Sequence, residues 1–368
     1  MELLATLLQK IIGAFIALGV VISTFLGGPH VAVTSSPTQQ ATTTVIAMST
    51  VAKSQGAGQK SGTISVSTNI SQPRRSSDEV GAPTKASEEQ VNEETRAALV
   101  NILCISQGGG VGSISGSGVV IDSRGVILTN AHIGQYFLLR DYPTANNVDC
   151  TIRVGSPAAR LYRATLLYLP PSWINANAQE IIAQQATGTG ENDYSLLLIN
   201  STTDPAGVLP TSFPALTIDT TPVKIGESML LASYPAGFLS GELIEKSLYQ
   251  SSAVAYVTQF FSFDSANRLD LFSIGGTVVS QAGSSGGAAV HLSDGTLAGI
   301  IATATVGTVT SERDLRAVTI THINASLAAG GMGGIAAILA GDLSAKAAVF
   351  NAGEGNQERN ALQYYLNH

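Results

Sequence analysis

The sequence carries little charge and has no large basic cluster. Only 12% of its 368 residues are charged, the formal net charge is −7, and no group of lysines and arginines is larger than Arg74-Arg75. These features exclude an extended nucleic-acid surface, because such surfaces need clustered positive charge. The mean hydropathy of +0.24 implies a surface rich in serine, threonine, glycine and asparagine. The length is enough for one large domain or two smaller ones.

Cysteine is also scarce, since the chain contains only Cys104 and Cys150. Two cysteines in an exported protein are compatible with one disulfide, and two buried thiols are the alternative. The residues alone leave both readings open.

One long apolar run lies near the N-terminus. Residues 11–27 contain no charge, Lys10 precedes them, and no basic residue follows until Lys53. Positive charge before an apolar run indicates that the rest of the chain is exported. The run is shorter than the about 20 residues of a membrane-spanning helix, unless it extends to Val33. We expect residues 1–33 to be a signal anchor or a cleaved signal peptide. We favour the anchor, because no small-x-small cleavage site follows closely; a buried core helix is disfavoured, since nothing nearby can cover it.

The segment 34–86 differs in composition from the rest of the chain. It is rich in Ser, Thr, Gln, Ala, Gly and Pro and contains no aromatic residue. Such a segment cannot bury enough apolar surface to offset its loss of conformational entropy. We expect a disordered linker with a typical reach of about 40 Å.

Regular structure is expected to resume at Ser87. Ser87 and Gln90 match a capping box, which predicts a short helix that runs to about Ala98. Short runs of β-forming residues follow, separated by Gly, Asn, Asp and Ser, and this rhythm predicts an all-β sandwich or a pair of barrels. The expected strands are 99–106, 118–122, 126–129, 150–154, 194–199, 228–233, 253–258, 276–280, 288–292, 298–304 and 317–322.

Two stretches depart from the β-type rhythm. Residues 170–190 are typical of an insertion with a short helix. The Ala/Gly-rich stretch 324–350 predicts a packed helix pair with Asn324 as the N-cap, within a C-terminal helical extension of residues 326–368. Asp342 and Lys346 in this stretch argue against a second membrane span.

The first candidate for chemistry is Ser285, in the run Gly283-Ser284-Ser285-Gly286-Gly287. Glycine permits backbone conformations that other residues rarely adopt, so this turn can expose a hydroxyl together with two backbone N–H groups. Acyl transfer by a serine nucleophile requires that combination. A loop that is merely rich in Gly and Ser is the alternative in a chain with 38 glycines.

The second candidate is His132. Residues 116–132 predict a hairpin with its turn near residues 122–125, and His132 comes just after the second strand. A histidine at such a position is partly exposed and suits general-base work near neutral pH. A purely structural histidine is the alternative. The other four histidines lack this context: His30, His291, His322 and His368.

The third candidate is Asp193, which precedes an apolar run at residues 194–198. An acid there can be buried, accept a hydrogen bond from a histidine Nδ1–H and hold the tautomer that leaves Nε2 free. An ordinary loop aspartate before a strand is the alternative. Asp193 therefore gains its meaning only together with His132 and Ser285.

Taken jointly, these motifs resemble the trypsin-like serine peptidases, in their HtrA-like branch. The pattern Gly-Ser-Gly-Val-x-Ile-Asp…Gly-x-Ile-Leu-Thr-Asn-Ala-His over residues 116–132 is specific, and the three candidates follow the family order. Residues 226–237 and 297–304 also look like family strands. The resemblance covers about residues 99–325.

The resemblance implies a fold of two six-stranded antiparallel β-barrels, at about residues 99–200 and 215–325, with the site in the cleft between them. It also supports a Cys104–Cys150 disulfide, because the strands that hold these cysteines are neighbours in this fold. Closing a loop of that length contributes up to about 4 kcal/mol in the chain-entropy model.

The resemblance also assigns roles. Ser285 would attack, His132 would act as general base, and Asp193 would orient His132. The N–H groups of Gly283 and Ser285 would form the oxyanion hole. This chemistry requires no cofactor and no metal ion.

Three features depart from the family pattern. His132 and Asp193 are separated by 61 residues, more than in compact members, and the interval contains the 170–190 insertion. Ser284 stands where Asn or Asp is frequent. The residues after the peptidase domain of 87–325 are too few for a PDZ domain. The regulated oligomers of the HtrA-like branch therefore cannot be carried over to this chain, and the oligomeric state stays open.

The resemblance gives a limited view of specificity. Val279, six residues before Ser285, is expected to form the floor of the pocket, and Ala302, Thr303 and Ala304 its wall. No acid is present there, so cleavage after Lys or Arg is not expected. Small apolar walls favour Ala, Val or Leu at the cleaved position, with modest discrimination, since one methylene is worth about 1–3 kcal/mol.

These observations predict a membrane-anchored or secreted serine endopeptidase that acts on polypeptides outside the cytoplasm. Its partners would be polypeptide substrates and, through the N-terminal apolar segment, a membrane. One alternative is a catalytically silent barrel pair that serves as an envelope binding module. Another is a serine esterase of the α/β-hydrolase fold, which the order of His132 and Ser285 and the β-type runs after the serine disfavour.

Overall fold

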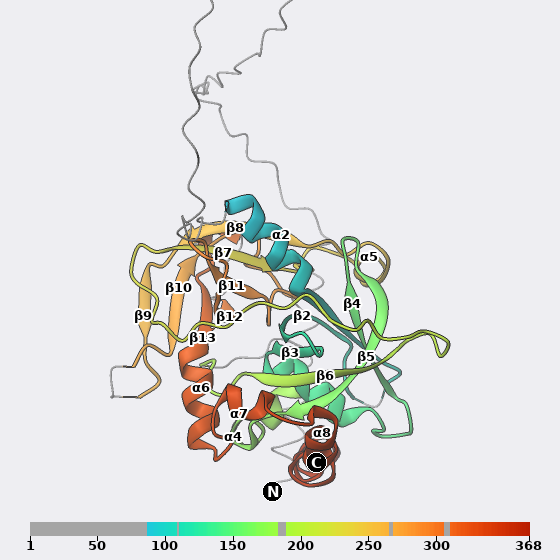
Figure 1. The fold of residues 1–368 in the computed structure, drawn as a ribbon. Helices are drawn as coiled ribbons and strands as arrows, with labels where there is room; N and C mark the ends of the chain where they lie inside the picture. Colours follow the sequence, from blue (N-terminus) through green and yellow to red (C-terminus); the bar gives the residue numbers. More distant parts are fainter. Residues whose placement is uncertain (1–86, 109, 183–188, 265–267, 305–309) are drawn as a thin grey trace, which may run out of the picture. The chain divides into compact units, whose positions relative to one another are not determined.

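The structure is a computed structural model, and it describes residues 87–108, 110–182, 189–264, 268–304 and 310–368 (Figure 1). The predicted signal segment and linker, residues 1–86, lie outside the described residues. Within the described part of the chain, no helix is long and apolar enough to cross a membrane.

The first half of the described chain forms a closed antiparallel barrel of six strands, called barrel one, as predicted. The strands follow the order β1-β2-β3-β6-β5-β4 around the barrel. Their bounds are β1 Leu99–Ser106, β2 Ile114–Asp122, β3 Val126–Thr129, β4 Val148–Val154, β5 Ala159–Tyr168 and β6 Ser195–Thr202.

The hairpin of β2 and β3 is the predicted one, with its turn at the predicted place. Gly125 has a φ of +90°, a backbone conformation that glycine adopts without strain. The Asp122 carboxylate accepts from the Arg124 backbone N–H at 2.9 Å and fixes the same turn. The hairpin ends at Thr129, so the next residues emerge at one end of the barrel.

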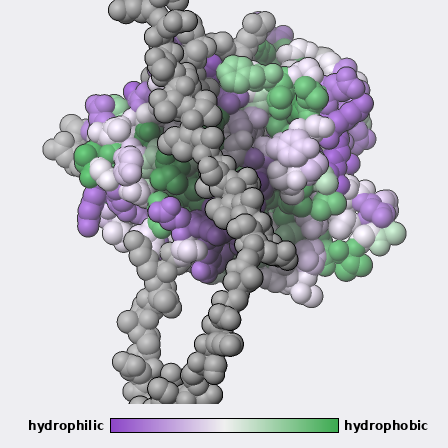
Figure 2. Space-filling model, turned by 90° about the horizontal axis from the view of Figure 1, so that it is seen from above, coloured by the Kyte–Doolittle hydropathy of each residue, from purple (hydrophilic) through white to green (hydrophobic). Residues whose placement is uncertain are grey.

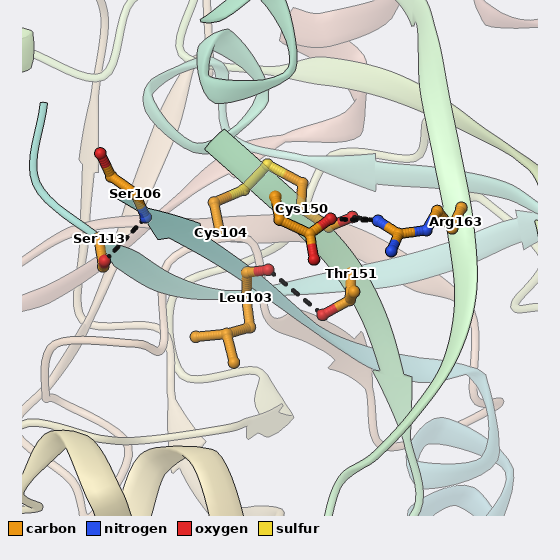
Figure 3. The surroundings of a disulfide bond; sticks show 8 residues. Leu103, Cys104, Ser106, Ser113, Cys150, Thr151 and Arg163 are labelled. Carbon is orange, nitrogen blue, oxygen red and sulfur yellow. Dashed lines mark hydrogen bonds and ion pairs between the residues drawn. A yellow bond between two sulfur atoms is a disulfide. The ribbon is translucent and has the colours of Figure 1, made fainter. Parts of the chain in front are cut away.

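The disulfide that the resemblance implied is present. Cys104 of β1 lies directly opposite Cys150 of β4 in the antiparallel register, and a disulfide joins them. Figure 3 shows the bridge between the two strands, with Arg163 beside Cys150. The bridge closes a 46-residue segment of the barrel.

The second half differs from the predicted closed six-stranded barrel. It is a seven-stranded sheet in the order β8-β7-β11-β12-β13-β10-β9. β8 and β9 form the two ends of this order and no pairing joins them among the described residues, so the sheet stays open as a half-barrel. The bounds are β7 Ser228–Ser233, β8 Ser251–Tyr256, β9 Gln259–Phe261, β10 Leu271–Gly275, β11 Ala288–His291, β12 Leu297–Ala304 and β13 Leu315–Thr319.

One predicted strand, at residues 276–280, is wrong. The segment is a turn, because the Thr277 N–H donates to Ser280 Oγ at 2.9 Å and the Ser280 N–H donates to the Thr277 carbonyl at 2.9 Å. The strand β10 lies just before it and ends at Gly275, whose φ is +69°. The half-exposed strand β5 was also missed, since its first residues are polar and interrupt the apolar pattern.

The predicted N-terminal helix is α2, Glu88–Ala98, and it packs against β7 and β2 (Figure 1). Ser87 is its N-cap and accepts from the Gln90 backbone N–H at 3.1 Å. Glu88 in the first turn and Arg96 in the last turn interact favourably with the helix dipole. The Gln90 side chain donates to Glu94 instead, so only half of the capping box forms.

The helices α4, α6, α7 and α8 lie below the strands in the view of Figure 1. A short helix in the 170–190 insertion was predicted and is present as α4. The bounds are α3 Ala131–Gly134, η1 Gln135–Leu139, α4 Pro171–Asn177, η2 Ala178–Ile182, α5 Gly241–Lys246, η3 Thr310–Glu312, α6 Ile320–Ala329, α7 Ile335–Leu339, α8 Leu343–Ala352 and α9 Glu354–Asn367.

The predicted N-cap Asn324 is wrong, because α6 begins earlier. Thr319 is the N-cap of α6 and accepts from the His322 backbone N–H at 3.0 Å. Asn324 lies within α6, and its Oδ1 accepts from the Ile335 N–H at 3.0 Å, at the start of α7. Asn324 therefore caps the start of the neighbouring helix α7 and not the start of its own helix.

The apolar core continues from the barrel into the C-terminal helices. One large buried cluster contains barrel residues such as Ile127 and Leu197 together with Phe350 of α8 and Leu362 of α9. A second, smaller cluster lies within the open sheet. On the face seen in Figure 2, hydrophilic and hydrophobic residues lie side by side.

Candidate active site

His132 and Asp193 are joined by three hydrogen bonds. His132 Nδ1 lies 2.9 Å from Asp193 Oδ2 and 3.1 Å from Oδ1, and the His132 backbone N–H donates to Oδ1 at 3.0 Å. The Asp193 side chain is 8% exposed and that of His132 is 18% exposed. The Asp193 carboxylate thus fixes the His132 ring through Nδ1, and Nε2 is the ring nitrogen that remains for proton transfer.

The segment that carries Asp193 is fixed on both sides by one helix residue. Ser326 Oγ of α6 donates to Asn192 Oδ1 at 3.0 Å, and Tyr194 OH donates to Ser326 Oγ at 2.9 Å. Asn192 has a φ of +58°, a left-handed conformation that few non-glycine residues adopt. Asn130 Nδ2 also donates to the Asp193 carbonyl at 2.9 Å. Ser326 was not predicted, because nothing in the sequence of α6 points to residue 193.

Pairing with a carboxylate does not by itself distinguish His132. His291 Nδ1 lies 2.6 Å from Glu227 Oε1, and His322 Nδ1 lies 2.8 Å from Asp270 Oδ1. The side chains of these two histidines are only 5% and 7% exposed. Their Nε2 atoms are buried and make no hydrogen bond among the described residues, although His291 Nε2 lies 3.9 Å from Asp219 Oδ2. His132 differs because its ring is accessible.

The run 283–287 forms a tight loop that separates the roles of its two serines. Ser284 is buried, and its Oγ accepts from Ser233 Oγ at 2.9 Å. Ser285 is only partly buried. Gly283 and Gly286 have φ values of +89° and +82°, so the loop requires glycine at both positions. The loop therefore buries one hydroxyl and presents the other.

The loop also leaves two backbone donors unused. The Ser284 N–H donates to the Gln281 carbonyl at 3.2 Å, and the Gly286 N–H donates to the Ile301 carbonyl at 2.7 Å. The N–H groups of Gly283 and Ser285 donate no hydrogen bond within the part of the chain that the structure describes. Two free N–H groups next to a partly exposed hydroxyl suit the binding of a developing oxyanion.

Ser117 of β2 connects this loop to barrel one. Its backbone N–H donates to the Ser285 carbonyl at 2.7 Å, and its Oγ donates to the Gly283 carbonyl at 2.7 Å. Ser117 Oγ also accepts from the Tyr234 N–H at 2.9 Å. Ser117 belongs to the predicted pattern of residues 116–132, but no role was predicted for it.

The same contact places the loop close to His132. Thr129, three residues before His132, donates from Oγ1 to the Ser117 carbonyl at 2.7 Å. A Cβ atom on Gly286 would lie 2.4 Å from Thr129 Oγ1 and 2.1 Å from the Ser117 carbonyl oxygen. The loop backbone therefore packs tightly against the strand end that leads to His132. No hydrogen bond joins Ser285 Oγ to His132 among the described residues; such catalytic contacts often form only when substrate is bound.

The predicted pocket residues lie in or beside the open sheet. Val279 is fully buried in the smaller core cluster, and Ala302 is 7% exposed. Thr303 and Ala304 pair with Arg316 and Leu315 of β13; their side chains lie outside what the structure describes.

The comparisons with known proteins agree with this fold. The family model of the trypsin-like peptidase domain matches residues 116–300, which is half of the chain, and the chain belongs to this family. It is therefore a trypsin-like peptidase. A search of the curated proteins gave no match.

Several solved structures are similar to this chain. The Rv3671c protease from M. tuberculosis in its active form is 18% identical with a TM-score of 0.41, covering 71% of this chain and 93% of that one. The serine endoprotease from Yersinia pestis is 19% identical with a TM-score of 0.41, covering 68% and 66%. The HtrA-type protease AlgW with tripeptide is 18% identical with a TM-score of 0.43, covering 67% and 65%. This chain thus spans slightly less than two thirds of the latter two.

Proposed function

We propose that the protein is a serine endopeptidase whose catalytic triad is His132, Asp193 and Ser285. The observation that carries the proposal is the His132–Asp193 pair next to a loop that presents Ser285. His132 Nδ1 lies 2.9 Å from Asp193 Oδ2 and 3.1 Å from Asp193 Oδ1. The family membership supports the same reaction class, and Ser284 is unsuited because its hydroxyl is buried and hydrogen-bonded.

The reaction follows from these positions. His132 Nε2 accepts the proton of Ser285 Oγ as this oxygen attacks the peptide carbonyl carbon. The carbonyl oxygen becomes an oxyanion, which the N–H groups of Gly283 and Ser285 stabilise. His132 then donates the proton to the leaving amine, and an acyl-enzyme remains on Ser285. Water attacks this ester with His132 again as base, and the peptide acid is released.

The substrate preference that we propose is for Ala, Val or Leu at the cleaved position. Of the two predicted pocket residues whose side chains are described, Ala302 is apolar and 7% exposed, and it supports a small apolar wall. Val279 is apolar but fully buried in the core cluster. No acid among the predicted pocket residues can pair with a lysine or arginine of the substrate. Discrimination among small apolar residues is then expected to be modest.

We also propose that the peptidase acts outside the cytoplasm. The apolar run 11–27 after Lys10 supports export, and the Cys104–Cys150 disulfide supports an oxidising compartment. A retained anchor would tether the peptidase to the membrane, and cleavage would release it.

A peptide-cleavage assay tests the proposed function. The full chain is incubated with a peptide library, and the new termini are identified by mass spectrometry. We expect cleavage after small apolar residues by the wild type and none by Ser285→Ala. The matched control is Ser201→Ala, which removes an exposed hydroxyl of β6; this variant should cleave normally. Absence of cleavage by the folded wild type would favour the silent binding module.

A further inference from the structure

A cavity of about 750 Å³ lies on barrel one, away from the triad residues. Its walls come from β4, β5 and η1 and from the C-terminal helices α8 and α9. Its volume is within the range of roughly 300–1,000 Å³ that small-molecule sites occupy. Neither His132 nor Asp193 nor Ser285 lines it.

Three arginines from three separate elements line this cavity. Arg140 follows η1, Arg163 belongs to β5, and Arg359 belongs to α9. The whole chain has only 19 lysines and arginines and a net charge of −7. The acids that line the cavity are Asp141 and Asp149, so three guanidinium groups face two carboxylates and leave an excess of positive charge.

Each guanidinium group is held by a neighbour yet keeps an unused donor. Arg163 Nη1 pairs with Asp149, and Arg359 Nε donates to the Leu138 carbonyl at 3.1 Å. Arg140 Nη2 donates to Asn146 Oδ1 at 3.0 Å. Within the described residues, no hydrogen bond is made by Nη2 of Arg163, Nη2 of Arg359 or Nη1 of Arg140. Side chains that are already ordered lose less conformational entropy when a ligand binds.

Side-chain amides complete the wall. Asn200 of β6 is exposed at the cavity. Asn351 of α8 is fixed there, since its Nδ2 donates to the Leu166 and Ala347 carbonyls at 2.7 Å each. Amides supply both donors and acceptors, which suits a polar ligand and not an aliphatic one.

We propose that this cavity binds a small molecule that carries an anionic oxygen group, either a carboxylate or a phosphate. Guanidinium groups bind such groups through paired, charge-assisted hydrogen bonds. A ligand held by Arg163 and Arg359 connects barrel one to α9, so its binding ties the C-terminal helices to the peptidase barrel. The proposal does not depend on the triad.

Calorimetric titration of the full chain tests this site with two probes, inorganic phosphate and citrate. At least one probe is expected to bind with one-to-one stoichiometry and to raise the melting temperature. Binding of citrate alone assigns a carboxylate ligand, binding of phosphate alone assigns a phosphate ligand, and binding of both assigns a general anion site.

The variant Asn200→Asp adds a carboxylate at the cavity without changing side-chain size. It should weaken binding about tenfold or more, because like charges at contact distance repel even near a protein surface. Asn175→Asp makes the same charge change at an exposed position of α4, outside the residues that line the cavity, and should bind as the wild type does. The proposal is overturned if neither probe binds the wild type, or if both variants bind equally well.

Discussion

The backbone N–H of Ser117 donates to the carbonyl of Ser285 at 2.7 Å, across the junction of the closed barrel and the open sheet. The Ser117 hydroxyl makes a second contact, to the Gly283 carbonyl. One buried residue of barrel one thus fixes the backbone on both sides of Ser284. The geometry of the nucleophile loop depends on barrel one as well as on its own sheet.

Ser117→Ala should therefore lower kcat more than it changes KM. The substitution leaves the Gly283 carbonyl and the Tyr234 N–H without their partner, and an unsatisfied buried group costs about 1–3 kcal/mol. The backbone N–H groups of Gly283 and Ser285 are then no longer held in position to bind the oxyanion. We therefore expect kcat to fall about tenfold or more. Steady-state kinetics with Ser115→Ala as control measures this. Ser115 Oγ accepts only from Asn101 on the same barrel; an equal loss in both variants would contradict the assigned role.

Ser326→Ala should affect the acid of the triad without touching it. The variant loses the bonds to Asn192 and Tyr194, so the segment that carries Asp193 can move away from His132. We expect kcat to fall about tenfold with little change in KM, because Asp193 then orients the His132 ring less well. Thr321→Ala on the same helix, which loses a bond to the Thr220 carbonyl, should keep the wild-type kcat and KM. Equal kinetic constants in all three proteins, or an equal fall in kcat in both variants, would refute the positioning role.

The sequence was informative where chemistry depends on neighbours in the chain. The hairpin that ends at His132 and the loop around Ser285 were predicted from adjacent residues. The disulfide was instead implied by the resemblance to the trypsin-like family, in which the strands that hold Cys104 and Cys150 are neighbours. Ser117 and Ser326 were not, because their contacts join residues 166 and 134 positions apart and serine is common in this chain.

The open sheet was also not predicted, because its closure depends on residues far apart in the chain. Short β-type runs predict strands, but whether the terminal strands meet depends on curvature and register over the whole sheet. Residues 276–280 have the composition of a strand, yet two hydrogen bonds between Thr277 and Ser280 form a turn. Local composition does not report such competing contacts.

The disulfide should make a measurable contribution to stability. The chain-entropy model gives up to about 4 kcal/mol for a closed segment of this length, so Cys104→Ala/Cys150→Ala should unfold at a lower denaturant concentration. Intact mass with and without reduction should differ by two hydrogens. Titration of two free thiols in protein purified from an oxidising compartment would contradict the bridge.

The buried carboxyl of Glu358 should make stability depend on pH. It is 3% exposed, and neither of its oxygens has a partner among the described residues. Burial, reinforced by Glu354, raises the pKa of Glu358 from 4.5 to about 8. The folded protein then binds more protons than the unfolded chain between these two values. Stability is therefore greatest below pH 4.5 for this group and falls as pH rises toward 8.

Glu358→Gln removes that titration. The variant should gain stability at pH 8 relative to the wild type, by a few kcal/mol, and its melting temperature should change less between pH 5 and 8. Glu354→Gln, on the same helix but exposed, should have only a small effect. Parallel pH profiles for the wild type and Glu358→Gln would show that the carboxyl ionises normally.

Site-resolved labelling with a fluorophosphonate tests the triad most directly. The probe reacts only with a serine that has an active base, so tryptic peptides report which hydroxyl is activated. We expect labelling of Ser285 in the full-length wild type, and a loss of labelling rate of about 10³-fold or more in His132→Ala. Labelling at another serine, absence of labelling in the folded wild type, or an unchanged rate in His132→Ala would contradict it.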